Sequence, residues 1–132
     1  MALSHKKCRY CARGYQFSDR VLLRNNYWIG VFDNHPVSPG HMKLVARRHQ
    51  KSFARLSTQE MAAFLEILRR AKTLVKRKHR PDGWNIGINE GSAAGQTVFH
   101  LHVHLIPRYK DDITDPRGGV RTILPGGNYL RD

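Results

Sequence analysis

Two short apolar runs separated by a turn are the first regular pattern along the chain. Residues 27–32 (YWIGVF) and 42–46 (MKLVA) have the length and composition of β-strands. Residues 33–41 between them contain Pro36 and Pro39, which exclude regular structure there. The pattern predicts two strands that pair around this turn.

A long amphipathic helix is predicted next. Ser57 and Glu60 have the S-x-x-E spacing of a capping box, which marks a helix start. Apolar residues then recur every three or four positions, and the helix should end near Pro81. The predicted apolar stripe consists of Met61, Phe64, Leu65, Leu68, Ala71 and Val75.

The second half of the chain returns to strands. Residues 84–90 alternate as in a strand, and residues 91–97 (GSAAGQT) form a loop of small residues. The run 99–109 (FHLHVHLIPRY) follows directly and predicts a strand that Pro107 ends. Strands arranged around one long helix indicate an α+β domain with an antiparallel sheet.

Three histidines stand at alternate positions of the last predicted strand. Residues two apart on a strand face the same way, so His100, His102 and His104 share one face. The other face, directed toward the helix, carries Phe99, Leu101, Val103 and Leu105. Metal ligands, satisfied core residues and a catalytic face are three interpretations. Rings about 7 Å apart converge poorly on one ion, and three core rings would each need partners. Different roles for the three rings are therefore favoured.

The loop before the histidines suits an anion. Residues 89–97 (NEGSAAGQT) offer small side chains and backbone N–H groups that can form an anion-binding nest. A neutral imidazole beside such a nest can attack phosphorus and carry a transient phosphoramidate. Surrounding donors would stabilise the developing charge. The pattern favours phosphoryl chemistry.

The segment GQTVFHLHVHLIPRY resembles the signature of the histidine triad (HIT) superfamily, in which three histidines alternate with apolar residues. HPVSPGH and NEGSAAGQTV resemble the superfamily's other two landmark segments in the same order, so the resemblance covers residues 27–109. It implies a five-stranded antiparallel sheet with one long amphipathic helix, paired into a homodimer. It also implies cleavage or transfer at the α-phosphorus of nucleotides through a covalent nucleotidyl-histidine. The motifs are most similar to the fragile-histidine-triad-like and bacterial branch.

The same resemblance assigns roles to individual residues. His102 would be the nucleophile, His104 would contact the phosphate and leaving group, and His41 would lie near them. Gln96 would reach the leaving-group oxygen, although it could instead cap a loop. The remaining substrate-binding residues would be Asp33, at the ribose hydroxyls, and a phosphate cradle made of Asn89 and the N–H groups of Gly95 and Thr97.

Cys8 and Cys11 form a C-x-x-C pair that is best explained as half of a zinc site. A structural disulfide is the less favoured use in a chain without an export signal. Some HIT proteins place zinc between such a pair and two histidines, and the matching residues here are His49 and His100. The resemblance thus implies a closed, structural Cys₂His₂ site.

Length and charge bound the remaining questions. The 132 residues predict one domain, 1–132, with a zinc segment at 1–20 and a Gly/Pro-rich tail at 111–132. The net charge of +13 favours polyanionic partners. The sequence shows neither an apolar run long enough to span a membrane nor a signal peptide, so we expect a cytoplasmic protein that does not bind membranes.

These observations lead to three functional hypotheses. The favoured one is a nucleotide hydrolase or transferase acting on nucleoside phosphoramidates or dinucleoside polyphosphates, with an AMP-type purine nucleotide as the default substrate. The high positive charge motivates a second, removal of adenylate from nucleic-acid ends, with nucleic acid as a less favoured partner. The third is a nucleotide-binding module without catalysis.

Overall fold

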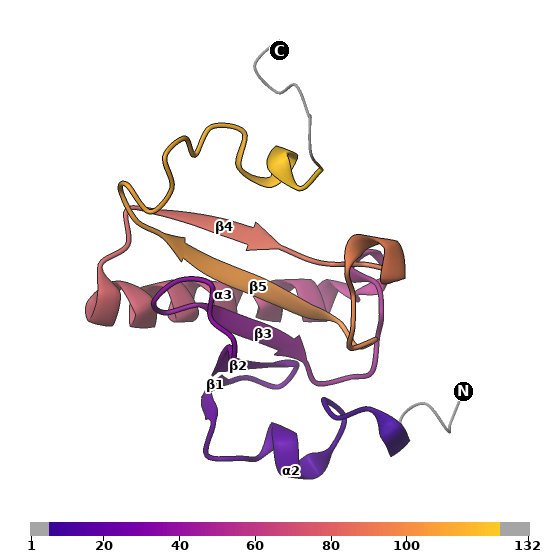
Figure 1. The fold of residues 1–132 in the computed structure, drawn as a ribbon. Coiled ribbons are helices and arrows are strands. Elements are labelled where there is room, and N and C mark those ends of the chain that lie inside the picture. The colour runs from indigo at the N-terminus through magenta and orange to yellow at the C-terminus, as the bar shows by residue number, and fades with distance from the viewer. Residues whose placement is uncertain (1–5, 125–132) are drawn as a thin grey trace.

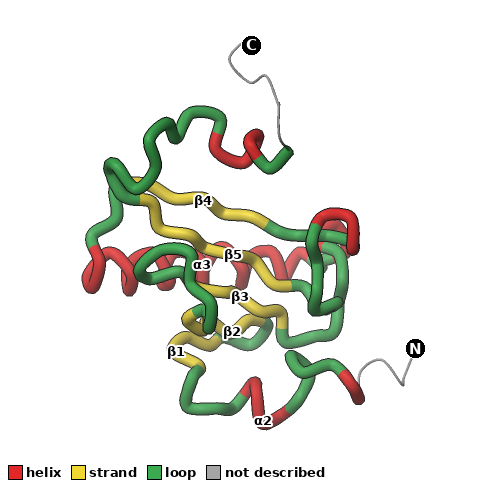
Figure 2. Tube along the Cα trace, in the orientation of Figure 1, coloured by secondary structure: helices red, strands yellow, loops and turns green. Residues whose placement is uncertain are grey.

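Five antiparallel strands form a single sheet in the computed structural model, which describes residues 6–124 (Figures 1 and 2). The strand order is β1-β2-β3-β5-β4. The strands are Val21–Arg24 (β1), Trp28–Phe32 (β2), Met42–Ala46 (β3), Gly83–Gly87 (β4) and His102–Arg108 (β5). The predicted α+β class and five-stranded antiparallel sheet are confirmed, as is the hairpin of β2 and β3.

The predicted long helix is α3, Thr58–His79. Its capping box is complete, since Ser57 Oγ accepts from the Glu60 N–H at 3.1 Å and the Glu60 carboxylate accepts from the Ser57 N–H at 3.0 Å. Arg80 ends the helix in the left-handed conformation, with φ of 53°. A one-turn helix, α2 (Arg13–Gln16), and strand β1 were not predicted, because four-residue elements are too short to show periodicity.

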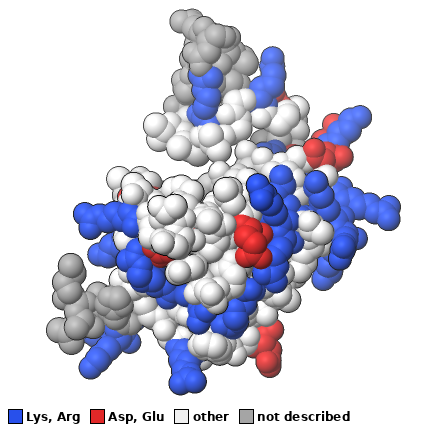
Figure 3. All heavy atoms as spheres, turned by 180° about the vertical axis from the view of Figure 1, so that it is seen from behind, with Lys and Arg blue, Asp and Glu red and all other residues white. Residues whose placement is uncertain are grey.

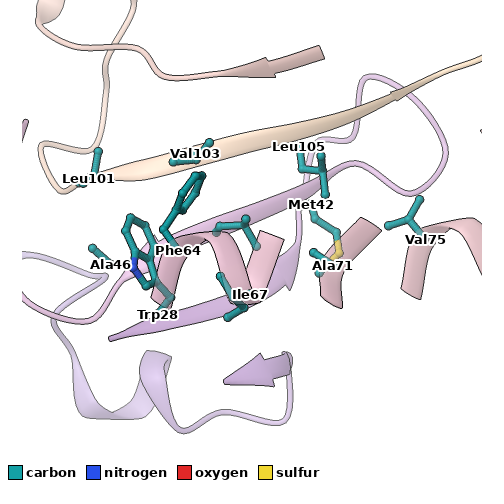
Figure 4. Close-up of a cluster of buried hydrophobic side chains, with 11 residues drawn as sticks. Trp28, Met42, Ala46, Phe64, Ile67, Ala71, Val75, Leu101, Val103 and Leu105 are labelled. Carbon is teal, nitrogen blue, oxygen red and sulfur yellow. The ribbon is translucent and has the colours of Figure 1, made fainter. Parts of the chain in front are cut away.

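The apolar side chains of α3 pack against the sheet, but the stripe differs from the predicted one (Figure 4). Ile67 is fully buried although the prediction omitted it, whereas Leu65 is 46% exposed. The buried positions Phe64, Ile67, Ala71 and Val75 are three or four residues apart and therefore lie on one side of the helix. Leu65 follows Phe64 directly and is therefore rotated from it by about 100° around the helix axis, away from the sheet.

Strand β5 is shorter at its start than predicted and longer at its end. Phe99 lies outside the strand and is 42% exposed, so its placement on the apolar face was wrong. The strand continues through Pro107 to Arg108. Pro107 pairs with Trp84 of β4, while the pairing of β5 with β3 extends only to Leu105. The missing N–H of Pro107 therefore faces no partner strand on the β3 side, where a proline is tolerated.

The two faces of the sheet have different covers. Leu101, Val103 and Leu105 lie in the same buried cluster as the apolar side chains of α3, as predicted. The N-terminal segment lies across part of the opposite face, where Tyr10 and Ile29 belong to a smaller buried cluster. His102 and His104 alternate with the apolar residues of β5 and share this second face. The helix face is therefore the main core, and the other face is available for a site.

Basic side chains cover much of the molecular surface. The view from behind shows many Lys and Arg side chains and few acidic ones (Figure 3). The exposed residues of α3, such as Arg69 and Arg77, contribute to this charge. Within residues 6–124, no helix is long and apolar enough to cross a membrane.

The two predicted terminal segments are described only in part. The zinc segment is described from residue 6 and the tail as far as residue 124, so residues 1–5 and 125–132 lie outside the described part of the chain. The tail includes a short 3₁₀ turn, Gly119–Thr122, that contacts β4. This contact places the tail along the edge of the sheet.

Candidate functional site

His102 begins β5 on the face opposite α3, and its orientation is set by a backbone bond. Its Nδ1 lies 2.7 Å from the His100 carbonyl oxygen. A carbonyl oxygen only accepts hydrogen bonds, so this contact assigns the proton to Nδ1 and leaves the lone pair on Nε2. Burial lowers the pKa of His102 below the ordinary histidine value, which keeps the ring neutral at pH 7. A neutral imidazole held this way can act as a nucleophile through Nε2.

His41 and His104 form a hydrogen-bonded pair beside it. The Val37 N–H donates to His41 Nδ1 at 3.2 Å, so the proton of neutral His41 lies on Nε2. His41 Nε2 is 2.9 Å from His104 Nδ1 and donates to it. The remaining proton of neutral His104 must then lie on Nε2. The chain of bonds turns His104 into a hydrogen-bond donor whose acceptor is not part of the pair.

Asp33 lies next to both rings, with Oδ2 at 3.5 Å from His41 Nε2 and 3.6 Å from His104 Nδ1. Burial raises its pKa, but the His35 N–H and the charge of Lys43 outweigh this and hold the pKa below the ordinary value. Burial lowers the pKa of His41, and burial together with repulsion between the protonated forms of His104, His102 and His41 lowers the pKa of His104 to about 4. Neutral rings therefore face an ionised carboxylate at pH 7, and the contacts are not ion pairs.

The loop between β4 and β5 is held by its own polar groups. The Gln96 side chain accepts from the Gly91 N–H at 2.8 Å and donates to the Val98 carbonyl at 3.2 Å. The Gly95 N–H donates to the Ser92 carbonyl at 3.0 Å. Gln96 thus caps the loop, the alternative named for it, and its contact with a leaving group stays a prediction.

Of the predicted phosphate cradle, Thr97 has a donor that is still available. Its N–H has no hydrogen-bond partner among residues 6–124, whereas that of Gly95 is used within its turn. Asn89, the first residue of this loop, is exposed. Gly91 and Gly95 have φ of 90° and 87°, a conformation that glycine adopts without strain. The Thr97 N–H thus follows a turn, residues 92–94, that has a glycine of positive φ at each end.

The four predicted metal ligands lie together, although 92 positions of sequence separate the first from the last. Cys8 Sγ lies 3.3 Å from His100 Nδ1, and Cys11 Sγ lies 3.1 Å from His49 Nδ1 and 3.4 Å from His100 Nδ1. All four donor atoms are within 4.8 Å of one another. A tetrahedral zinc ion with sulfur and nitrogen ligands separates such atoms by about 3.5 Å. These residues could therefore hold a metal ion.

Two further observations fit a metal ion at this cluster. His100 Nε2 lies 2.5 Å from the Ala46 carbonyl oxygen, so its proton is on Nε2 and Nδ1 is free to coordinate. Burial and the neighbouring Cys8 raise the pKa of the Cys11 thiol to about 12. A raised pKa opposes ionisation of the Cys11 thiol, and the positive charge of a coordinated metal ion would favour its thiolate.

Two residues adjoin the histidines without having been predicted. Lys43 on β3 is opposite His104 in the sheet and is 6% exposed. Tyr10 is 2% exposed, and its ring contacts the rings of His100 and His102 edge-on. The sequence signal was a lysine inside the apolar run 42–46, where a buried strand otherwise carries no charge.

A neutral histidine nucleophile beside a histidine pair is typical of an enzyme that acts on phosphate groups, and comparison with known proteins identifies the family. The family model of the HIT domain matches residues 15–111. The chain therefore belongs to the HIT family, in agreement with its histidine strand and its fold.

Several relatives have named activities. An AP-4-A phosphorylase of Mycobacterium tuberculosis is 34% identical over 101 residues, which cover 74% of this chain and 52% of that protein. An asymmetrical bis(5'-nucleosyl)-tetraphosphatase of Schizosaccharomyces pombe is 34% identical over 76% of this chain and 56% of its own length. An uncharacterized HIT-like protein of Saccharolobus solfataricus is 32% identical over 70% of this chain and 66% of its own length. The chain thus matches about half to two thirds of the length of these relatives.

Solved structures share the fold. A zinc-bound histidine triad family protein from Mycobacterium smegmatis has a TM-score of 0.71 at 26% identity, over 84% of this chain and 81% of that one. A HIT family protein from Bacillus anthracis also has a TM-score of 0.71, at 27% identity over 80% of this chain and 75% of its own. The first of these shows that a HIT protein with this arrangement of strands binds zinc.

Proposed function

We propose that this protein is a nucleotide hydrolase or transferase that acts at the α-phosphorus of dinucleoside polyphosphates or nucleoside phosphoramidates. The observation that carries the proposal is the bond between His102 Nδ1 and the His100 carbonyl, which directs the lone pair to Nε2. Relatives named as an AP-4-A phosphorylase and a bis(5'-nucleosyl)-tetraphosphatase support dinucleoside polyphosphates as the substrate class. The nucleotide retained on the protein is of the AMP type.

In the first step, His102 Nε2 attacks the α-phosphorus and forms a P–N bond while the bond to the leaving group breaks. His104 Nε2–H donates to the departing oxygen or nitrogen, and His41 holds His104 in the tautomer that can do so. The Thr97 N–H and Asn89 bind the phosphoryl oxygens, and Gln96 reaches the leaving-group oxygen. Asp33 binds the ribose hydroxyls.

In the second step, water or phosphate attacks the nucleotidyl-histidine and the P–N bond breaks. His104 donates a hydrogen bond through Nε2 in both steps, while the proton of the attacking water passes to solvent and the electron pair of the broken P–N bond returns to His102 Nε2. The resting protonation state is restored, with AMP or a nucleoside diphosphate as the product. Water and phosphate as acceptors distinguish a hydrolase from a phosphorylase, and product analysis separates them.

The metal cluster has a structural role in this proposal. Zinc would occupy the site of Cys8, Cys11, His49 and His100, and all four of its positions would be filled by protein. It would fasten the N-terminal segment to the start of β5, directly before the nucleophile. We propose further that residues 1–132 form one HIT domain and that two chains associate as a homodimer, which light scattering would measure.

The test is turnover of diadenosine polyphosphates and an adenosine phosphoramidate by the parent protein and by His102→Ala. The parent should release AMP, and mass spectrometry of the quenched reaction should detect adenylylated protein. Turnover by His102→Ala at the parent rate would exclude the nucleophile. If the parent acted only on adenylated DNA ends, with a steep loss of rate in salt, removal of adenylate from nucleic acid would replace the proposed activity.

A further inference from the structure

Lys43 is a buried cation in the middle of the sheet. It lies on β3, where all five residues are buried, and its partner across the sheet is His104 of β5. Only 6% of Lys43 is exposed to solvent. Lysine is almost never buried unless it is paired, so this position requires an explanation.

No carboxylate pairs with Lys43 in the described part of the chain. Its one hydrogen bond within residues 6–124 runs from Nζ to the Tyr10 hydroxyl oxygen, at 3.0 Å. Asp33 is near enough for Lys43 to lower its pKa, but it forms no ion pair with the lysine. An ammonium group has three donors, so at least one more acceptor is needed to satisfy it.

The ammonium group belongs to the histidine cluster. Its charge acts on His41, His102 and His104, in each case disfavouring protonation of the ring. Tyr10, which holds the ammonium group, packs edge-on against the His102 ring at 5.2 Å between ring centroids. A metal cation beside these rings would be repelled by Lys43, whereas an anion would be attracted.

We propose that Lys43, positioned by Tyr10, is a binding site for an oxygen of the phosphoryl group that His102 attacks. This inference rests on the proposed function and adds a binding group to it from a different element than the β4–β5 loop. The ammonium group donates a hydrogen bond to the anionic oxygen. That oxygen supplies the acceptor and the negative charge that the described residues do not supply.

The arrangement also connects the metal cluster to the phosphate. Tyr10 stands between Cys8 and Cys11, so an N-terminal segment fixed at the cysteines places the Tyr10 hydroxyl on the lysine. Tyr10 is a positioning residue because it contacts Lys43 and the His102 ring and has no predicted contact with substrate. Lys43 contacts the substrate directly.

Calorimetric binding of AMP and of adenosine tests the proposal without turnover. Lys43→Met keeps the length of the side chain and removes its charge. AMP should bind more weakly by on the order of tenfold to a hundredfold, which is the range for loss of a charge-assisted hydrogen bond. Adenosine lacks the phosphate, so its affinity should not change. Lys43→Arg should restore part of the AMP affinity, and Tyr10→Phe should weaken AMP alone by a smaller factor.

The matched control is Lys76→Met on α3, at the opposite face of the sheet, which should bind AMP like the parent. Equal AMP affinity in Lys43→Met and Lys76→Met would overturn the proposal, as would an equal loss of AMP and adenosine binding. Lys43→Gln replaces Lys43→Met if the latter does not fold by circular dichroism. Absence of turnover in the parent would reject the proposed function, while the AMP and adenosine comparison would still decide the role of Lys43.

Discussion

His41 Nε2 and His104 Nδ1 lie 2.9 Å apart and are joined by a hydrogen bond whose direction is fixed by the Val37 N–H on the far side of His41. This single contact determines which nitrogen of His104 faces the rest of the site with a proton. The arrangement makes His41 important without requiring it to contact a substrate.

Replacing His41 should therefore lower turnover through His104. In His41→Leu the donor to His104 Nδ1 is lost and the His104 ring can adopt the other tautomer. We expect kcat to fall by on the order of tenfold to a hundredfold with little change in KM, as for other residues that orient a catalytic ring. His41→Gln keeps a donor group and should retain more activity than His41→Leu. Equal rates for the two variants would contradict the role.

Because the histidine pKa values are lowered, the stability of the folded protein should depend on pH. His104 titrates at about 4 in the folded protein and near 6.5 when unfolded, so the unfolded chain binds more protons between these values. The contribution of His104 to the free energy of unfolding is therefore fully present above pH 6.5 and is lost as the pH falls toward 4. Urea unfolding of the parent and His104→Gln should show a shallower loss in the variant over this range. If stability fell equally with pH in the parent and in His104→Gln, the assignment to His104 would be wrong. Loss of metal does not explain a difference between the two, because it is common to both proteins.

Removing one cysteine should abolish the metal site. Purified parent protein should contain about one zinc per chain, and Cys11→Ser close to none. The variant should also unfold at a lower temperature, because the N-terminal segment loses its attachment to β5. Ser18→Ala, in the same segment but outside the cluster, serves as the control and should keep its zinc. If the purified parent protein contained no zinc, the metal assignment would be wrong.

The capping box of α3 gives a prediction that is independent of function. Ser57→Ala removes the acceptor for the Glu60 N–H and should destabilise the protein by about 1 kcal/mol. Thr73→Ala, in the exposed middle of the helix, should change stability much less. Chemical denaturation measures both. Similar losses would show that the cap contributes nothing particular to the fold.

Protonation of Glu60 should account for part of the loss of stability at low pH. The hydrogen bonds from Arg48 lower the pKa of this buried carboxyl below its ordinary value of 4.5, despite the opposing effect of burial. Its contribution to stability is present above pH 4.5 and is lost as the pH falls through the lower, folded value. Glu60→Gln should be less stable than the parent at pH 7, with the difference shrinking below pH 4.5. A constant difference would contradict this assignment.

Two glycines of positive φ should differ in their tolerance of alanine. A Cβ at Gly40 would lie 2.8 Å from His79 Cδ2 and 2.9 Å from Val75 Cγ1, whereas one at Gly95 would meet nothing within 4 Å. Both replacements carry the left-handed backbone cost of about 1–2 kcal/mol. Gly40→Ala should cost more, because α3 must also move. Equal losses in thermal unfolding would show that the turn before His41 can shift away from the helix.

Much of the site was predictable because it is encoded in local spacing. Alternation placed His102 and His104 on one face and the capping box placed the start of α3, and the structure has both. The cluster of Cys8, Cys11 and His49 with the first histidine could not be derived from spacing alone, since sheet pairing brings these segments together. It came instead from resemblance to a family.

The features that were missed depend on packing. Ile67 is buried because of how α3 rotates against the sheet, which the three- and four-residue spacing does not fix. Strand β5 runs through Pro107 because its pairing with β3 ends at Leu105, so no strand pairs with Pro107 on that side. The hydrogen-bond partner of Lys43 is a tyrosine 33 positions earlier in the chain, and its partner across the sheet is His104, far beyond it. Such contacts follow from sheet order, and a single run of residues does not contain that information.

The pairing of β3 with β5, in which Lys43 lies opposite His104 and Leu44 opposite Val103, also governs how the protein can fail. A shift of β5 by one residue would turn Val103 and Leu105 toward the histidine face and its imidazoles toward α3. His102 would lose its orientation in the same event that empties the main core. Folded but inactive chains of shifted register should therefore not accumulate, and the fraction of molecules able to become adenylylated should equal the fraction that is folded.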